Sequence, residues 1–256
     1  MRLAYVAPRL QWDGAMPPPE FQPVAGMFVS RAHVTVVAGP RGTGKTTRVL
    51  DLVRHARQGH SAAGAAALAV PSAHPARQLS VVVFTDLPHE YADVPECEVR
   101  ASTDVQWLEH AVATRGPGTP PLVVVLEDGA GNYAFARSDA AARVFAGARH
   151  ARLHLFVTLQ NARDLRPHAR AHVDLFVLTP AWNLLLMLRD VFPNVEPSLV
   201  HAELRSLRGF EALVSAVQSG QLFRYASRYT RPGHVAPDVV HAGSSAPAQI
   251  APDMPP

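Results

Sequence analysis

The most constraining feature of this chain is a glycine-rich turn that joins an apolar run to a helix-forming segment. Residues Gly39–Thr46 read GPRGTGKT and match the pattern G-x-x-x-x-G-K-[ST]. The five residues before the turn, Val34–Ala38, are predicted to form a buried strand, and residues 44–56 are compatible with a helix. A strand, a glycine-rich turn and a helix in this order predict a phosphate-binding loop.

Lys45 supports this interpretation because it is the only lysine among the 256 residues, and every other strongly basic side chain is an arginine. A compact ammonium on a flexible stem is retained at this one position. We expect the loop amides to wrap phosphate groups, Lys45 to reach the outer phosphates and the Thr46 hydroxyl to coordinate Mg²⁺. ATP and Mg²⁺ are the predicted ligands. The loop residues predicted to hold the nucleotide are Gly39, Pro40, Arg41, Gly42, Thr43, Gly44, Lys45, Thr46 and Thr47.

The second diagnostic segment is an apolar run that ends in two acids. Leu122–Leu126 is predicted to be a buried parallel strand, and Glu127 and Asp128 follow it directly. Ligands bind beyond the carboxyl ends of strands in open α/β sheets, so we expect both acids to meet the glycine-rich loop in one crevice. Glu127 would hold the magnesium shell, and Asp128 would act as general base on a water molecule. Two carboxylates this close need a cation between them or a raised pKa.

A third strand tip adds a polar side chain. Leu153–Gln160 is predicted to be a core strand that follows the acid-tipped strand in order and ends in an amide. Gln160 suits a sensor that hydrogen-bonds the γ-phosphate or the attacking water, and a solvent-facing strand end is the alternative. Water-activating ATPases need both a second acid and such an amide, whereas small-molecule kinases do not require them.

The length fits one α/β domain with appendages, and 48% hydrophobic residues are enough for a real core. We predict a P-loop NTPase fold with a mainly parallel central sheet flanked by helices and a C-terminal β-hairpin. The domain is expected at residues 34–230, after an N-terminal arm at 1–33 and before a flexible tail rich in proline, alanine and serine at 231–256. The other predicted elements are strands at 80–85, 97–101 and 174–179, helices at 104–114, 138–149 and 182–191, a loop at 61–76 and hairpin strands at 212–217 and 222–226.

Cys97 is the only cysteine, so no internal disulfide can form and a reducing compartment is expected. No apolar run approaches the roughly 18 to 20 residues of a membrane span, and the N-terminal segment lacks a secretory signal. We therefore expect a protein that is neither secreted nor inserted in a membrane.

The net charge is only +3, but the basic residues are clustered. Between Arg137 and Arg170 there are seven arginines and two aspartates. A basic segment within a nearly neutral chain is the electrostatic footprint of binding to nucleic acid or to nucleotide phosphates. A solvated, arginine-rich face is the alternative.

Taken together, Gly39–Thr46, Leu122–Asp128 and Phe145–Thr179 resemble the genome-packaging ATPases of large DNA viruses, with the poxvirus type closest. Those proteins belong to the FtsK–HerA group of P-loop motors, and the resemblance covers roughly residues 34 to 180. Its most specific part is the spacing of Arg149-His150, Gln160, Arg163 and Arg170. Glu127 departs from the family, which usually carries aspartate there, whereas Asp128 matches the second acid.

The resemblance implies a DNA-stimulated ATPase that pumps viral double-stranded DNA into an immature particle. It would act as a ring-shaped homo-oligomer, a pentamer or hexamer, docked on viral assembly, portal or membrane proteins. Its expected location is the host cytoplasm at assembly sites or the virion. In ring motors an arginine of the neighbouring subunit stabilises charge on the transferring phosphoryl group. The candidates are Arg149, Arg152 and Arg170, with Arg149 and Arg170 favoured, and Arg163 and Arg166 are candidates for contacts with DNA phosphates.

Two other functions are compatible with these residues. In a P-loop kinase for a nucleoside or nucleotide, the arginines would clamp substrate phosphates and Asp128 would accept a hydroxyl proton. In a nucleotide-dependent binding switch, turnover would be negligible and Asp128 would be dispensable. A dedicated arginine-rich lid and a pocket for a substrate base, the usual signs of a kinase, are not apparent in the sequence.

Overall fold

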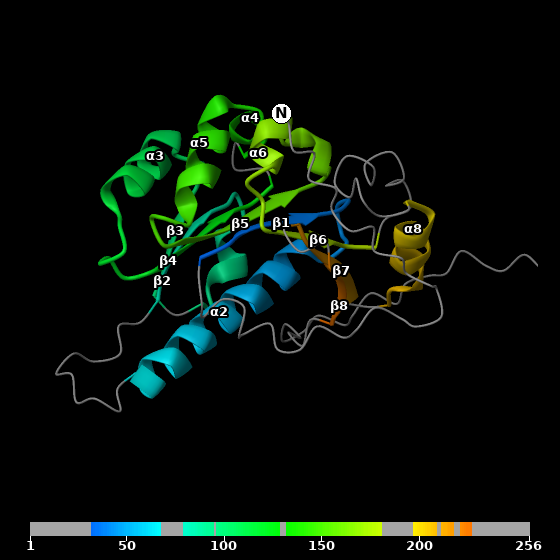
Figure 1. The fold of residues 1–256 in the computed structure, drawn as a ribbon, viewed down its shortest axis with the longest axis horizontal. Coiled ribbons are helices and arrows are strands. Elements are labelled where there is room, and N and C mark those ends of the chain that lie inside the picture. Colours follow the sequence, from blue (N-terminus) through cyan, green and yellow to red (C-terminus); the bar gives the residue numbers. More distant parts are fainter. Residues whose placement is uncertain are drawn as a thin grey trace, which may run out of the picture.

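The computed structural model describes residues 32–67, 79–94, 96–128, 132–180, 197–208, 211–217 and 221–226. Figure 1 shows a central sheet with helices on both sides. The elements in chain order are β1 (Val34–Ala38), α2 (Lys45–Ala67), β2 (Ser80–Phe84), η1 (Pro88–Tyr91), β3 (Cys97–Arg100), α3 (Val105–Thr114), β4 (Leu122–Leu126), α4 (Asn132–Ala136), α5 (Asp139–Ala148), β5 (Leu153–Leu159), η2 (Ala162–Asp164), α6 (Pro167–Arg170), β6 (Leu175–Leu178), α8 (Pro197–Ser206), β7 (Glu211–Ala216) and β8 (Gln221–Ala226).

Within the described residues, the strands form one eight-stranded sheet in the order β3-β2-β4-β5-β1-β6-β7-β8. Strands β3 to β6 in this order pair in parallel, and β7 and β8 join the edge as antiparallel strands. This confirms the predicted α/β fold with its mainly parallel sheet and its C-terminal hairpin. Strand β5 pairs with β4, so the strand that ends before Gln160 lies beside the acid-tipped strand.

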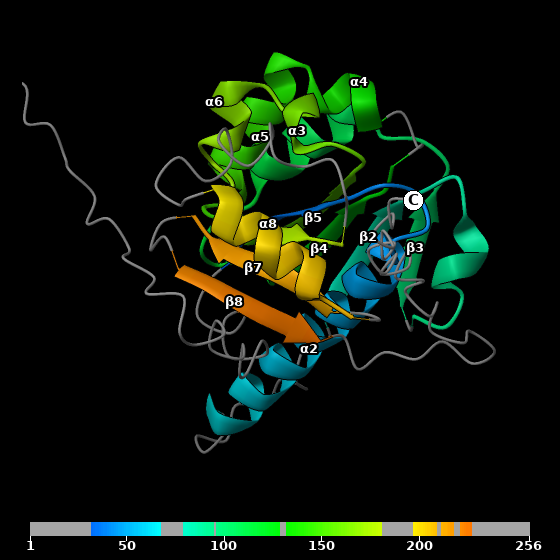
Figure 2. The same cartoon turned by 90° about the vertical axis from the view of Figure 1, so that its right-hand side faces the viewer.

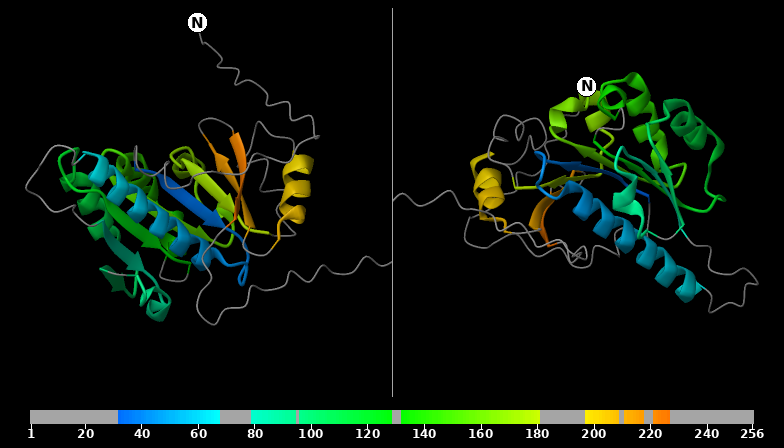
Figure 3. Two further views of the ribbon diagram at one scale, coloured as in Figure 1. Left: turned by 90° about the horizontal axis from the view of Figure 1, so that it is seen from below. Right: turned by 180° about the vertical axis from the view of Figure 1, so that it is seen from behind.

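The sheet buries two apolar faces because side chains alternate along each strand. Val36 and Val124 belong to the face covered by α3, α4, α5, α6 and α8, whereas Val37 and Val125 belong to the face covered by α2. Figure 2 shows the two helical layers above and below the sheet, and Figure 3 shows α2 lying across the face of the sheet opposite α3–α6. Both faces are covered, which is why the parallel strands read as continuous apolar runs.

Two helices begin where the sequence places a capping side chain. The Asp104 carboxylate accepts a hydrogen bond from the Trp107 N–H at the start of α3, and the Ser138 hydroxyl accepts one from the Ala141 N–H at the start of α5. Each cap satisfies an amide that has no partner within its helix. These contacts confirm both predicted helix starts.

Helix α2 is longer than predicted. It continues through residues 61–67, where we expected the beginning of a loop. This expectation was wrong because the segment is rich in alanine, which has the strongest intrinsic preference for helix, and its single glycine, Gly64, does not outweigh that preference. Residues 68–76, the predicted helix at 182–191, the arm up to residue 31 and the tail at 231–256 lie outside the described residues.

The described part of the chain contains no helix that is both long enough and apolar enough to cross a membrane.

A buried carboxylate ties a helix to the amino ends of two strands. Asp174, which precedes β6, is only 3% exposed. Its Oδ2 accepts a hydrogen bond from the Val34 N–H at 2.9 Å, and its Oδ1 lies 3.0 Å from Nη2 of Arg149, the residue that caps the end of α5. The pairing therefore fixes where α5 ends relative to β1 and β6.

We expect Asp174→Ala to lower the free energy of unfolding by about 2 to 4 kcal/mol, because it leaves a buried amide and a half-buried guanidinium without their acceptor. Urea denaturation measures this change. The matched control is Glu109→Ala, which removes an acid from the exposed ion pair with Arg143 and should change stability by less than about 1 kcal/mol. Equal losses in the two variants would contradict the anchoring role.

Candidate functional site

Three strand tips meet in one row at the carboxyl edge of the sheet. Ala38, the last residue of β1, pairs with Leu159 of β5 on one side and with Leu178 of β6 on the other. The Gly39 N–H donates to the Leu159 carbonyl oxygen at 3.0 Å, and the Thr179 N–H donates to the Ala38 carbonyl oxygen at 3.0 Å. The glycine-rich loop thus leaves the sheet between two neighbouring strand ends, and its position is set by backbone hydrogen bonds.

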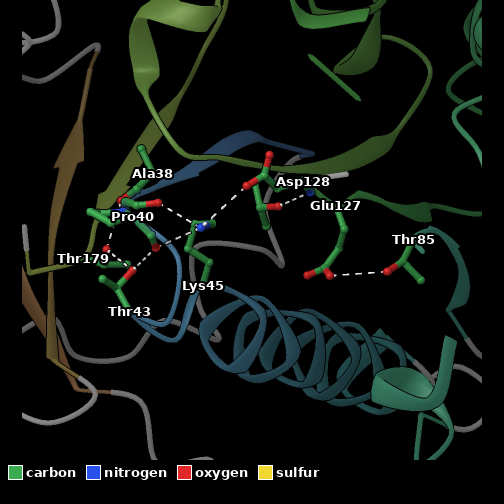
Figure 4. A network of polar contacts seen from close by, with 10 residues as sticks. Ala38, Pro40, Thr43, Lys45, Thr85, Glu127, Asp128 and Thr179 are labelled. Carbon is green, nitrogen blue, oxygen red and sulfur yellow. Dashed lines mark hydrogen bonds and ion pairs between the residues drawn. The ribbon is translucent and has the colours of Figure 1, made fainter. Parts of the chain in front are cut away.

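The loop needs glycine at three positions for two reasons. Gly42 and Gly44 have φ angles of 75° and 76°, a conformation that glycine adopts without strain. Gly39 instead lacks space, since a Cβ there would lie 1.7 Å from Oγ1 of Thr179. The Thr179 hydroxyl uses this space to donate to Oγ1 of Thr43 at 2.7 Å (Figure 4). Thr179 therefore braces the loop from β6, a role that sequence reasoning missed.

Lys45 opens helix α2 and points back over the loop. Its Nζ donates to the carbonyl oxygens of Gly39 at 2.8 Å and Pro40 at 3.0 Å, and lies 3.8 Å from Oδ2 of Asp128. Burial lowers the pKa of the Lys45 ammonium, while the charges of Asp128 and Glu127 act in the opposite direction. The structure thus brings the loop lysine and the second acid together, as the sequence predicted for one crevice.

The two adjacent acids point in different directions from the end of β4 (Figure 4). Asp128 extends toward Lys45, and Glu127 extends toward Thr85, whose hydroxyl donates to it at 3.4 Å. Glu127 is only 4% exposed. Its burial raises the pKa of its carboxyl group, and hydrogen bonds from Tyr91, Thr46 and Thr85 oppose that rise. Divergence, the nearby ammonium and the raised pKa together relieve the repulsion expected between the two carboxylates.

Tyr91 is the strongest partner of Glu127. It lies on η1, is 1% exposed, and its hydroxyl donates to Oε1 of Glu127 at 2.8 Å. The same carboxylate accepts a hydrogen bond from the Thr46 side chain at the start of α2. A hydroxyl and a carboxylate from two elements are the oxygen ligands that Mg²⁺ prefers. Thr46 and Glu127 therefore fit the predicted magnesium shell, with Tyr91 orienting the carboxylate.

Asp128 is held by its main chain. Its N–H donates to Oγ1 of Thr158 on β5 at 2.7 Å, and its side chain is 25% exposed. This bond fixes the backbone at the point where the acid leaves the sheet, so the carboxylate can face solvent and Lys45 at once. The role of Thr158 could not be predicted from the sequence, because threonine is a common residue within β-strands.

The remaining predicted residues are placed as follows. Gln160 directly follows β5 in the row of strand tips, and its side chain is exposed. Arg41 is exposed in the loop, and Thr47 lies in the first turn of α2. Arg163, Arg166 and Arg170 lie on the segment formed by η2 and α6 after β5.

Arg149 and Arg152 lie at the opposite, amino edge of the sheet. Arg149 pairs with Asp174, and Nη1 of Arg152 donates to the carbonyl oxygens of Pro117 at 3.2 Å and Thr119 at 3.0 Å. Within one chain the structure does not bring these two arginines to the loop. A role at the site of a neighbouring subunit stays a prediction for Arg149 and for Arg170.

Arg48 connects the loop to the C-terminal hairpin and was also missed by sequence reasoning. It lies one turn into α2 and is fully buried. Its Nη1 donates to the carbonyl oxygens of Thr43 and Gly44, and its Nη2 donates to the carbonyl oxygen of Glu211 on β7. Burial lowers the pKa of Arg48 to about 10, so the guanidinium stays charged at neutral pH. The hairpin and the loop are therefore linked through one buried cation.

Comparison with known proteins bears on the fold. No protein-family model and no curated protein sequence matches the chain. Solved structures do match. The genome packaging NTPase B204 from Sulfolobus turreted icosahedral virus 2, solved with sulfate, has a TM-score of 0.56 and 14% identity over 77% of this chain and 98% of its own. Its complex with ATP-gammaS has a TM-score of 0.54 and 15% identity over 76% and 96%.

A second kind of protein shares the architecture. The cytoplasmic domain of the Type VII secretion ATPase EccC from Thermomonospora curvata has a TM-score of 0.51 and 14% identity over 78% of this chain and 26% of its own. At these identities the likeness shows the fold. The chain has the P-loop NTPase fold that viral packaging ATPases and secretion ATPases also have.

Proposed function

We propose that this chain is an ATP-hydrolysing DNA translocase that packages viral double-stranded DNA and acts as a ring oligomer. The observation that supports ATP hydrolysis is the 3.8 Å distance between Nζ of Lys45 and Oδ2 of Asp128, beside the paired side chains of Thr46 and Glu127. The translocase part rests on the sequence resemblance to poxvirus-type packaging ATPases. A fold shared with a viral genome packaging NTPase supports it.

The loop residues would bind and orient the triphosphate. Lys45 now donates to two carbonyl oxygens of its own loop, and its ammonium would turn from these to the outer phosphate oxygens. The amides at the start of α2 would face the same phosphates, where the helix dipole favours negative charge. Mg²⁺, held by Thr46 and Glu127, would supply positive charge at the phosphates.

Asp128 and Gln160 would act on the attacking water. Asp128 is partly solvated and has a fixed main chain, so its carboxylate can accept the proton of a water positioned beyond β4. Gln160, at the end of the neighbouring strand β5, would hydrogen-bond the water or the γ-phosphate. Arg149 and Arg170 remain the proposed candidates for stabilising the phosphoryl group in a neighbouring subunit. Host-cell assembly sites or the virion are the proposed location.

Two residues carry the proposed chemistry, and their substitution tests it directly. Lys45→Ala should abolish measurable ATP turnover, and Asp128→Asn should reduce kcat by roughly 10² to 10⁴-fold because the general base is lost while the shape is kept. Long double-stranded DNA should stimulate the wild type and neither variant. Steady-state phosphate release with and without DNA measures both effects, and Asp93→Asn, an exposed acid outside the site, is the control.

These assays also separate the alternatives. Turnover that rises with a small phosphate acceptor instead of DNA would favour a P-loop kinase. Turnover that is negligible under all conditions, together with tight nucleotide binding in Asp128→Asn, would favour a binding switch. Wild-type turnover that ignores DNA would overturn the translocase proposal.

A further prediction concerns Tyr91. Tyr91→Phe removes the hydrogen bond that opposes the raised pKa of Glu127, so that pKa should rise further. Because Glu127 acts as a carboxylate, activity falls as the pH drops through its pKa. The acidic limb of the pH profile should therefore move to higher pH. The magnesium concentration for half-maximal turnover should increase about tenfold, as is typical when a group that orients a metal ligand is lost.

Tyr133→Phe is the matched control for Tyr91→Phe, because it removes a hydroxyl from a tyrosine that is 51% exposed. It should leave the magnesium dependence and the pH profile unchanged. A Tyr91→Phe protein whose magnesium dependence matches that of the control would show that Tyr91 serves packing alone.

A further inference from the structure

A basic pocket lies in the helical layer that contains α4, α5 and α6, and none of the residues that line it belongs to the glycine-rich loop. Its volume is about 420 Å³. We call it the arginine pocket, and the charged residues that line it are Arg137, Arg163, Asp164, Arg166 and Arg170. Arg137 directly follows α4, Arg163 and Asp164 lie on η2, and Arg166 and Arg170 lie at the two ends of α6. Figure 1 shows α4 and α6 beside α5 on one face of the sheet, and α5 packs against both.

We propose that the arginine pocket binds the backbone phosphates of double-stranded DNA, an assignment that rests on the proposed translocase function. The lining contains four arginines and one acid, Asp164. A guanidinium presents a planar fork of N–H donors that matches two phosphate oxygens, so a cluster of four suits a ligand with successive phosphate groups. Backbone phosphates carry no sequence information, and a packaging motor requires contacts of that kind.

The existing ion pairs at the pocket are of the weak, exchangeable kind. Nη2 of Arg137 lies 3.2 Å from Oδ1 of Asp164, and Arg166 pairs with Asp139, whose carboxylate also lies 3.5 Å from Nε2 of His168. The Arg137 and Arg166 side chains are 54% and 47% exposed. Ion pairs at exposed side chains contribute about 0 to 1 kcal/mol each. Phosphate oxygens can therefore replace the aspartates at little loss of stability.

The shape of the site favours binding of a phosphate group inside the pocket over insertion of one of its arginines into a neighbouring subunit. An arginine that reaches the nucleotide of a neighbouring subunit must project beyond its own surface. Here the four arginines line one hollow, and Arg137 and Arg166 are each paired with an aspartate. A concave basic surface receives an anionic ligand, and we therefore assign the pocket to DNA phosphates. Arg170, which also lines the pocket, stays a candidate for the neighbour's ATP and is left unchanged in the test.

The pocket is also connected to the proposed catalytic residues through the chain. Arg163 follows Gln160 by three positions at the end of β5, and Arg137 follows Asp128 by nine positions after β4. Both walls of the pocket are therefore built on segments that leave the two strands carrying the candidate base and the candidate sensor. DNA bound in the pocket would therefore contact the segments that follow β4 and β5 in the chain.

The test compares two double variants of the full chain that remove the same amount of positive charge. Arg137→Gln with Arg163→Gln removes two arginines of the pocket. Arg143→Gln with Arg205→Gln removes two exposed arginines outside it. Binding of a fluorescent, random-sequence duplex is measured without nucleotide over a range of salt concentrations. Affinity for an ATP analogue and the melting temperature are measured in parallel to show that the fold and the loop are intact.

We expect the pocket variant to bind the duplex at least about tenfold more weakly. Its salt dependence should be shallower by about two units of slope, one for each DNA phosphate that an arginine no longer neutralises. The control variant should match the wild type in slope. Retained affinity for the ATP analogue in the pocket variant would assign the effect to DNA binding alone.

Three outcomes would overturn the proposal. The pocket variant and the control could lose DNA affinity equally, which would indicate non-specific charge. The full chain could fail to bind the duplex at all. The pocket variant could bind DNA normally yet lose ATP turnover in the oligomer, which would place its arginines at the neighbour's nucleotide. Because binding is measured without nucleotide, and Lys45→Ala should still bind the duplex, failure of the ATPase activity is distinguishable from failure of the pocket.

Discussion

The parallel register at the centre of the sheet is the constraint on which the site depends. Ala38 pairs with Leu159 and with Leu178, and Leu126 pairs with Val157, so four strands end within a short distance of one another along one edge. Parallel pairing places these ends at the same edge. After β1, β4 and β5 the chain returns through a helix to the opposite edge of the sheet before the next strand begins. A shift of β1 by one residue would move Gly39 away from Leu159 and would turn every side chain of β1 to the other face of the sheet.

Buried polar contacts then hold the ends of those strands in place. Thr179 braces the loop from β6, Arg48 joins it to β7, Tyr91 orients Glu127, and Asp174 fixes the opposite edge. Each is paired with a partner from another element, as burial of a polar group requires. The hydrogen-bond network therefore does what apolar packing does not, since it sets the direction of individual carboxylates and amides around a site that must itself stay polar.

The charge distribution separates two tasks in space. The lysine and the two acids meet at the carboxyl edge, whereas the arginine pocket lies in the helical layer and Arg149 lies at the amino edge. The basic segment that appears continuous in the sequence is thus divided by the fold into surfaces with different surroundings. Arg149 and Arg152 have structural partners, whereas Arg137 and Arg166 are about half exposed in their pairs. The arginines of the pocket are therefore the part of the basic segment that can exchange their aspartate partners for a ligand.

The sequence by itself determined the glycine-rich loop, the apolar strands, the starts of α3 and α5 and the hairpin, because each is encoded by neighbours along the chain. It also indicated that Lys45 and Asp128 would meet, since both follow parallel strands. Only the tertiary structure decided which groups brace them. Tyr91 lies 36 residues from Glu127, Thr179 lies 136 from Thr43, and Arg48 lies 163 from Glu211. Such pairs leave no local pattern, because contacts between distant residues arise only when the sheet order brings their elements together.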